Sequence, residues 1–299
     1  MAKLSDYIEL TRPFTLLPPF MGFICFAAVA LGYGNIEINS SIFIKILIGA
    51  ISASILNAGS NIVNQIFDIE IDRVNKPARP LPSSRMKMKY AVVLAICLYI
   101  LSIFLSYLVS IQYFIIVLIT AFITYAYSGY PFRTKRFGIL ANITMAIPRG
   151  GLLIIAGWSA VRSVFEPEVW FIALIFFLYI LGASTTKDFS DIEGDRKGGC
   201  STLPIILGVK RAVIAITPAF VVPFILIIIF RVVGLLTGNA IILYSLGIIL
   251  SMWGVYVSWL LLRNPDDLCL EANHPSWKHM YLLMVVAQIG FASSYLIRF

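Results

Sequence analysis

The feature that most constrains this 299-residue chain is a stretch of mostly apolar residues that recurs along nearly its whole length. As an α-helix, a stretch of about 20 residues crosses a hydrocarbon layer of about 30 Å. Hydrophobic residues make up 60% of the chain, which is more than a soluble domain of this size can bury. The sequence therefore predicts an all-α membrane protein, with about nine transmembrane helices in a bundle. We expect these helices at residues 14–34, 41–66, 90–110, 112–128, 139–159, 168–186, 212–231, 239–262 and 279–297.

Basic residues gather in the segments that join these helices at one end. If the N-terminus lies inside, 18 of the 23 Lys and Arg residues fall on the cytoplasmic side. The positive-inside rule then predicts a cytoplasmic N-terminus and four cytoplasmic loops, at residues 67–89, 129–138, 187–211 and 263–278. This distribution explains the net charge of +8, so no nucleic-acid partner is expected. No cleavable leader is expected either, because the first apolar run follows Lys3 and Arg12 and no A-x-A-like site comes after it.

The acidic residues are few and clustered. The chain has 15 Asp and Glu residues, and seven of them fall in two short segments at predicted helix ends. Polar side chains in each segment recur at spacings of three or four, which places them on one face of a helix. Carboxylates at this spacing repel each other unless a cation lies between them, and Mg²⁺ prefers carboxylates that it shares with substrate phosphates. Glu70 and Glu193 are out of register and are expected to point elsewhere. The two predicted stripes are Asn64, Asp68 and Asp72, and Asp188, Asp191 and Asp195.

The two acidic segments also resemble each other. Asp-Ile-Glu-Ile-Asp at 68–72 and Asp-Ile-Glu-Gly-Asp at 191–195 differ at one position, and four predicted membrane crossings separate them. An even number of crossings brings both segments to the same face of the membrane, where the two stripes can face each other across one cavity. We interpret the segments as equivalent points of a duplication. The halves would be about 14–138 and 139–262, with a final helix at 279–297, in a single domain of residues 1–299.

Basic residues lie immediately beside these carboxylates. Arg73, Lys76 and Arg79 follow the first stripe, and Lys135 lies in the next predicted cytoplasmic loop. Arg and Lys neutralise phosphate oxygens, so these residues are expected to help to hold a diphosphate. Arg149 differs, because it lies in an otherwise apolar span, where a charged side chain usually faces the bundle interior. Both a functional role and simple pairing with an interior carboxylate or carbonyl stay open for Arg149.

Several motifs follow one another along the chain: Arg12-Pro13-Phe14-Thr15, Asn64-x3-Asp68-x3-Asp72, Arg73, Asn75-Lys76-Pro77, Arg79-Pro80, the Tyr127-Ser128 to Lys135-Arg136 loop, Asp191-x3-Asp195 and Thr202-Leu203-Pro204. This ordered set resembles the UbiA superfamily of intramembrane prenyltransferases. The resemblance implies a central cavity that is capped by cytoplasmic loops and opens sideways to lipid. It also implies two Mg²⁺ ions with a diphosphate between them.

The resemblance also implies roles for individual residues. Asp68, Asp72, Asp191 and Asp195 would be catalytic, and together with Asn64 they would bind the metal. The candidates for substrate binding are Asn64, Arg73, Lys76, Arg79, Tyr127, Lys135, Arg12, Arg149 and Asp188.

The implied reaction is Mg²⁺-dependent transfer of a prenyl group from an allylic diphosphate, such as geranylgeranyl diphosphate, to a membrane-associated acceptor. Departure of the diphosphate leaves an allylic carbocation, and Mg²⁺ with the basic residues stabilises the charge that builds on the leaving group. Apolar helix walls keep out the water that would quench the cation. Aromatic residues such as Tyr127 can offer it a π face. A quinone precursor, a tetrapyrrole and a prenylated glycerol phosphate all stay open as acceptors.

Three other interpretations compete with this one. The acidic segments can be ordinary solvated helix ends, although this leaves the repeated pentapeptide unexplained. A cation-coupled transporter also uses acidic residues inside a helical bundle, but usually near the membrane midplane. A phosphotransferase that makes phospholipids would need an Asp-Gly-x2-Ala-Arg element, which the sequence lacks. The transporter is kept as the alternative function.

Overall fold

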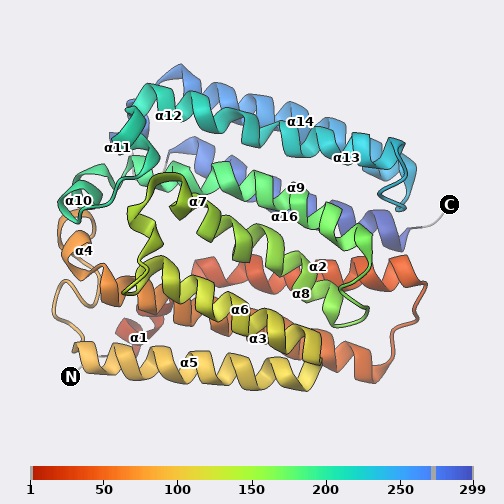
Figure 1. Ribbon diagram of the computed structural model, residues 1–299, viewed down its shortest axis with the longest axis horizontal. Helices are drawn as coiled ribbons and strands as arrows, with labels where there is room; N and C mark the ends of the chain where they lie inside the picture. The colour runs from red at the N-terminus through yellow and green to blue at the C-terminus, as the bar shows by residue number, and fades with distance from the viewer. Residues whose placement is uncertain (1–2, 271–273, 298–299) are drawn as a thin grey trace.

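The long helices of this protein run roughly along the long axis of the molecule (Figure 1). The structure is a computed structural model in which residues 3–270 and 274–297 are described. Within these residues, nine helices are long and apolar enough to cross a membrane, which confirms the predicted all-α membrane fold. The spans are Pro13–Gly34, Ser40–Phe67, Met88–Val109, Ile111–Ser128, Gly138–Ser159, Pro167–Phe189, Val209–Val232, Ala240–Arg263 and Pro275–Leu296.

Several spans are built from more than one helical segment. The α-helices are α1 (Leu4–Thr11), α2 (Leu17–Gly34), α3 (Ser40–Phe67), α4 (Ile69–Asn75), α5 (Met88–Val109), α6 (Ile111–Ser128), α7 (Gly138–Ala146), α8 (Leu153–Ser159), α9 (Pro167–Ala183), α10 (Ile192–Lys197), α11 (Leu203–Leu207), α12 (Val209–Ile216), α13 (Val222–Val232), α14 (Ala240–Arg263), α15 (Asp267–Leu270) and α16 (Pro275–Leu296). The fifth span joins α7 to α8 through a π-helical segment, Ile147–Leu152. Pro148 lies in this segment, and because proline has no N–H it cannot continue the α-helical ladder there.

The predicted spans agree with the observed ones to within about four residues at each end. The largest difference is at the last helix, which was expected at 279–297 and begins at Pro275. His274 caps this helix, because its ring nitrogen accepts a hydrogen bond from the Ser276 amide at 3.3 Å. The polar residues Lys278 and His279 lie in its first turns and lower the hydropathy there. Part of the predicted loop 263–278, residues 271–273, lies outside the described residues.

The centre of the bundle is packed with aromatic and small side chains. Phe23, Tyr113 and Trp158 are fully buried among α2, α6 and α8. Gly157 lets α8 approach α2, since a Cβ atom at this position would lie 2.5 Å from the carbonyl oxygen of Phe23. Small residues allow such close helix contacts in membranes, where helix association depends largely on van der Waals packing.

Both acidic segments lie at one end of the bundle, which we call the motif end. α4 and α10 lie side by side there, and the chain begins at the same end (Figure 1). Asn75 of α4 connects the two helices: its side chain donates to the Asp191 carbonyl at 3.0 Å and accepts from the Gly194 amide at 2.9 Å. A Cβ atom on residue 194 would lie 2.5 Å from the Asn75 amide nitrogen. The one difference between the two pentapeptides, Gly for Ile, is thus the change that lets the helices meet.

Candidate active site

Each acidic segment contains a short interruption between two helical pieces. α3 ends at Phe67 and α4 begins at Ile69, so Asp68 lies between them with φ −102° and ψ 15°. Asp191 precedes α10 with nearly the same conformation, φ −105° and ψ 5°. The prediction of one unbroken helical stripe in each segment is therefore wrong. The physical reason is that Asp favours helix ends over helix interiors, because its short side chain competes for backbone hydrogen bonds.

The interruptions preserve the spacing of the side chains. The Asp68 amide donates to the Asn64 carbonyl at 2.9 Å, and the Asp72 amide donates to the Asp68 carbonyl at 2.7 Å. The Asp195 amide bonds to the Asp191 carbonyl in the same way at 2.9 Å. These four-residue bonds keep each set of side chains on one side of its segment, as the spacing predicts.

The structure brings both segments to a single cavity at the motif end. Among the five carboxylates that line it are those of Asp68 and Asp72 on one side and of Asp191 and Asp195 on the other. Each of these residues is less than 9% exposed. Burying so many carboxylates together is unfavourable unless cations compensate for their charge. The other predicted residues that line the cavity are Asn64, Arg79, Tyr127, Lys135 and Asp188.

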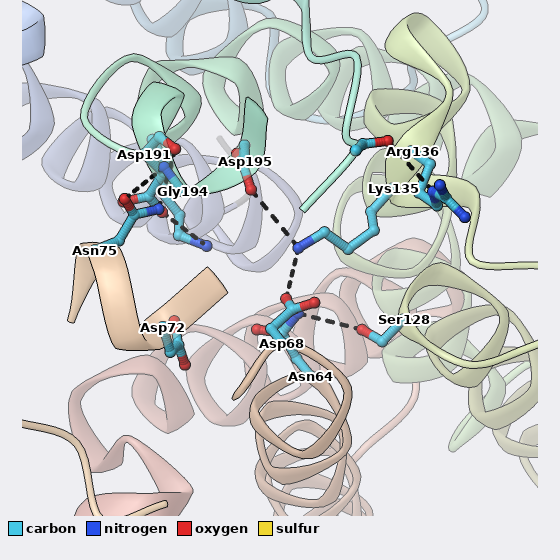
Figure 2. A network of polar contacts seen from close by, with 12 residues as sticks. Asn64, Asp68, Asp72, Asn75, Ser128, Lys135, Arg136, Asp191, Gly194 and Asp195 are labelled. Atoms are coloured by element: carbon cyan, nitrogen blue, oxygen red, sulfur yellow. Dashed lines mark hydrogen bonds and ion pairs between the residues drawn. The ribbon is translucent and has the colours of Figure 1, made fainter. Parts of the chain in front are cut away.

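Lys135 provides the central compensation, and it reaches between the two segments (Figure 2). Its Nζ lies 2.6 Å from Asp68 Oδ2 and 3.8 Å from Asp195 Oδ1. Burial alone would lower the pKa of Lys135, but the two carboxylates outweigh it, so its pKa is raised. Lys135 therefore stays charged at the position that joins both acidic segments.

Two further ion pairs compensate the charges of Asp72 and Asp191. Arg79 Nη1 lies 2.7 Å from Asp72 Oδ2, within the first segment and its loop. Lys76 follows the first segment but binds the second, with its Nζ 2.7 Å from both Asp191 carboxylate oxygens. Burial opposes ionisation of Asp191, but Lys187 and Lys76 outweigh it and hold the pKa of this carboxyl below its usual range.

Asp195 and Asp188 are less well compensated. The closest cation to Asp195 is Lys135 at 3.8 Å, and burial raises the pKa of the Asp195 carboxyl. The Asp188 side chain makes no hydrogen bond or ion pair with the described part of the chain, although it lines the cavity. The second segment thus holds carboxylate oxygens that are available for a further cation.

The donor set suits Mg²⁺ when the ion arrives with its substrate. All the candidate ligands are oxygens, from carboxylates and from the Asn64 amide, and Mg²⁺ prefers such hard donors. Among the described residues, no three His, Cys, Asp or Glu side chains converge tightly enough to form a metal site by themselves. Protein sites for Mg²⁺ commonly supply only one or two carboxylates and leave the other positions to substrate phosphates and water. The arrangement therefore fits metal binding together with a diphosphate.

Arg12 lies behind the first segment. Its Nη2 donates to the Asn64 side chain at 3.3 Å, while its Nε is buried without a partner. Burial and the nearby Arg79 lower the pKa of Arg12 to about 10, so the guanidinium remains charged at neutral pH. Arg12 is thus a half-buried cation whose Nε donor is unused among the described residues.

Four predicted residues do not line the cavity themselves: Arg12, Lys76, Arg149 and Arg73. Of these, Arg73 is exposed. It pairs with Glu70 at 2.6 Å, and both side chains are more than half exposed. Glu193 forms a similar exposed pair with Lys197 at 2.8 Å. The prediction that Glu70 and Glu193 point away is confirmed, whereas a role for Arg73 in binding substrate has no geometric support.

Lys187, Asn75 and Thr202 were not singled out as site residues. Lys187 and Thr202 line the cavity, and Asn75 connects the two segments. Lys187 directly precedes Asp188 and lies one helical turn from Asp191, so the spacing rule used for the acids could have identified it. Asn75 gives no such signal, because its partners are backbone groups more than a hundred residues away.

Known proteins are similar to this chain in sequence and in fold. The sequence profile of the UbiA prenyltransferase family matches residues 16–283. A digeranylgeranylglyceryl phosphate synthase from Methanosphaera stadtmanae is 29% identical over 97% of this chain and 98% of its own length. A solved structure of a digeranylgeranylglyceryl phosphate synthase is 28% identical with a TM-score of 0.71, over 98% of both chains. A UbiA homologue from Archaeoglobus fulgidus, solved with GPP and Mg²⁺, has a TM-score of 0.74 at 20% identity, over 97% of this chain and 99% of its own.

Proposed function

The chain belongs to the UbiA prenyltransferase family, and from this premise we propose that it transfers a geranylgeranyl-type group from its diphosphate to a hydroxyl group of a prenylated glycerol phosphate. One structural observation carries the chemistry: two acidic segments and their cations line one cavity. The choice among acceptors rests on relatives that match nearly the full length and are named for this reaction. The transporter alternative receives no support from the family or from the relatives.

The carboxylates would position the donor's diphosphate at the motif end. Asp68, Asp72, Asp191 and Asp195, with the Asn64 amide, would hold Mg²⁺, and the diphosphate would supply further ligand oxygens, as substrate phosphates do in other Mg²⁺ sites. When bound, Mg²⁺ supplies a positive charge where the leaving group becomes negative. We propose two such ions, one for each segment.

The lysines and Arg79 would take over part of the same task. In the structure, Lys76, Arg79 and Lys135 are each within 2.7 Å of a carboxylate oxygen. Once a metal ion compensates the carboxylates, these cations can turn to the phosphate oxygens, Arg79 by paired hydrogen bonds and the lysines as point charges. Charge stabilisation of this kind lowers the barrier to breaking the C–O bond of the allylic diphosphate, and each 1.4 kcal/mol corresponds to about tenfold in rate.

The acceptor would complete the reaction on the membrane side of the diphosphate. The hydroxyl oxygen forms a bond to the allylic carbon, the bond from that carbon to the diphosphate breaks, and the hydroxyl proton is released. Tyr127 lines the cavity at the end of α6, where its ring can face the developing cation. The apolar side chains of the bundle would hold both prenyl chains and exclude water.

The orientation and the duplication are part of the proposal. The motif end carries most of the basic residues, so the positive-inside rule assigns it to the cytoplasm, where a soluble diphosphate product can leave. Asp68 and Asp191 share one backbone conformation, which supports a single domain built from halves at about 14–138 and 139–262.

A product assay tests this function. The purified protein is incubated with Mg²⁺, geranylgeranyl diphosphate and a panel of acceptors, and the products are identified by mass. The expected product is a glycerol phosphate with two prenyl ethers, formed by the wild type and by Glu193→Gln but not by Asp191→Ala. The control changes an exposed carboxylate two residues away in the same segment. Prenylation of a quinone precursor instead, or full turnover by Asp191→Ala, would refute the proposal.

A further inference from the structure

Arg149 is a charged residue inside the membrane that the proposed handling of the diphosphate does not use. It lies in the fifth span, in the π-helical segment Ile147–Leu152. Its guanidinium makes no hydrogen bond or ion pair with the described part of the chain, and its side chain is exposed rather than packed. A charge in a membrane-spanning segment is costly unless it is paired or faces an interior space. Simple pairing with a protein carboxylate or carbonyl, the alternative that the sequence left open, is therefore not found among residues 3–270 and 274–297.

Two features indicate that the side chain of Arg149 faces the interior of the bundle rather than the lipid. Ala141, eight residues earlier on the same span, lines the cavity, and in a regular α-helix residue 149 would lie about 80° past the face of Ala141. Because a π turn uses more residues than an α turn, it keeps Arg149 nearer to the face of Ala141 than a regular helix would. The charge of Arg149 also acts on Tyr127, which lines the cavity, and on Arg12. At about 1.5 Å per residue, Arg149 lies about 12 Å deeper in the membrane than Ala141.

Arg12 gives the same region a second cation with spare hydrogen-bond donors. Its Nε is buried without a partner, and its one side-chain hydrogen bond goes to the Asn64 amide. Arg12 and Arg149 interact as like charges, so each raises the free energy of the other's charged form. Asp72 and Asp68 compensate part of the charge of Arg12, but Arg149 has no carboxylate partner among the described residues. An anion from outside the protein would therefore stabilise Arg149.

This anion would bind deeper in the membrane than the diphosphate of the donor. The carboxylates that would hold the metal-bound diphosphate already have Lys76, Arg79 and Lys135 as partners. Arg149 lies deeper, on the side where the allylic carbon of the donor must be if its chain extends into the membrane. The hydroxyl and the phosphate of a glycerol phosphate are only a few bonds apart. An acceptor whose hydroxyl reaches that carbon therefore brings its phosphate close to the same depth.

We propose that Arg149, assisted by Arg12, binds the phosphate group of the acceptor. The inference rests on the proposed function, which it refines by assigning the two anionic substrates to different cations. Paired N–H donors make a guanidinium specific for phosphate, so this site would select acceptors that carry a phosphate over neutral alcohols of the same length.

Binding measurements on the whole protein in detergent separate the two roles of the cations. The acceptor probe is 1-O-hexadecylglycerol 3-phosphate, and 1-O-hexadecylglycerol is its phosphate-free counterpart. The donor probe is geranylgeranyl thiolodiphosphate with Mg²⁺, which does not react. The variants are Arg149→Gln and Arg149→Lys, with Arg162→Gln as the control. Arg162 is an arginine of the loop before α9 that pairs with Glu166 at 2.6 Å.

The proposal predicts a selective loss. Arg149→Gln should weaken the acceptor probe by about tenfold or more, the usual worth of a charge-assisted hydrogen bond, and should change the donor probe by less than about twofold. Arg149→Lys should lie between the wild type and Arg149→Gln, because it keeps the charge but loses the paired donors. Arg162→Gln should bind both probes like the wild type. The affinity for the phosphate-free alcohol should be the same in all three variants as in the wild type.

Two results would overturn the assignment. Equal binding of the acceptor probe by Arg149→Gln and the wild type would show that Arg149 does not hold this phosphate. A larger loss for the donor probe than for the acceptor probe would assign Arg149 to the diphosphate instead. Failure of the proposed function is a separate outcome, seen as a wild type that binds the acceptor probe but forms no diprenyl ether in the product assay.

Discussion

Replacing Lys135 with methionine is the most informative single change, because this residue joins the two acidic segments. Its Nζ is 2.6 Å from Asp68 and 3.8 Å from Asp195, and the side chains of Lys135 and Asp68 are only 8% and 6% exposed. Removing one partner of a buried ion pair costs about 3–5 kcal/mol, because the other charge is left unpaired. Arg133 remains 3.5 Å from Asp68, so we expect the lower end of this range, about 3 kcal/mol.

The cost should depend on Mg²⁺, which distinguishes a metal site from ordinary charge pairing. In EDTA, Lys135→Met should lower the Tm in detergent by about 5 °C or more. With Mg²⁺ present, the ion can compensate Asp68 and Asp195, so most of the lost stability should return. The transfer activity of Lys135→Met should stay low even with Mg²⁺, because the diphosphate of the donor loses the cation of Lys135.

A matched control is Lys197→Met, which breaks an exposed pair with Glu193 at the same end of the bundle. Exposed pairs contribute little to stability, so this variant should unfold like the wild type with and without Mg²⁺. The reasoning would be refuted if Lys135→Met were as stable as the wild type in EDTA. It would also be refuted if Mg²⁺ raised the Tm of Lys135→Met and of the wild type by the same amount.

Three further predictions concern the metal, the contact between the segments and the packing of the bundle. Chelation by EDTA should abolish product formation, and added Mg²⁺ should restore it; steady turnover in EDTA would contradict the role of the carboxylates. Asn75→Ala removes both hydrogen bonds between α4 and α10 and should cost about 1–3 kcal/mol in chemical denaturation, with a lower kcat; an unchanged kcat would show that the two segments align without it. Gly157→Val should destabilise the protein by about 1–3 kcal/mol or more, because the new Cβ would meet the Phe23 carbonyl. The control Gly151→Ala should leave the Tm unchanged, because a Cβ there meets nothing within 4 Å. Equal Tm values for the two glycine variants would rule out this close packing of α8 on α2.

The helices and the meeting of the acidic segments could be predicted because they follow from composition and parity. A stretch of apolar residues long enough to span lipid has few alternatives to a helix, since backbone groups there must be satisfied within the segment. Four crossings between Asp68 and Asp191 bring both to one end whatever the packing between helices. The start of the last helix was missed, because Lys278 and His279 reduce the hydropathy of a segment that Pro275 and His274 begin.

The directions of individual side chains were harder to predict. Arg73 and Lys76 both follow the first acidic segment, but only Lys76 reaches the second one, where it binds Asp191. Arg73 lies within α4, whereas Lys76, three positions later, follows the end of the helix at Asn75, so their side chains reach different partners. Asp68 and Pro148 each favour an interruption, but the sequence alone does not specify that the helix breaks at Asp68 or that a π turn forms around Arg149.

A structure of the protein with Mg²⁺ and geranylgeranyl thiolodiphosphate would test the central claim most directly. The account predicts that the diphosphate lies in the cavity at the motif end, with metal ions that contact carboxylates of both segments, from Asp68 or Asp72 and from Asp191 or Asp195. A diphosphate bound outside this cavity, or held by one segment alone, would contradict it.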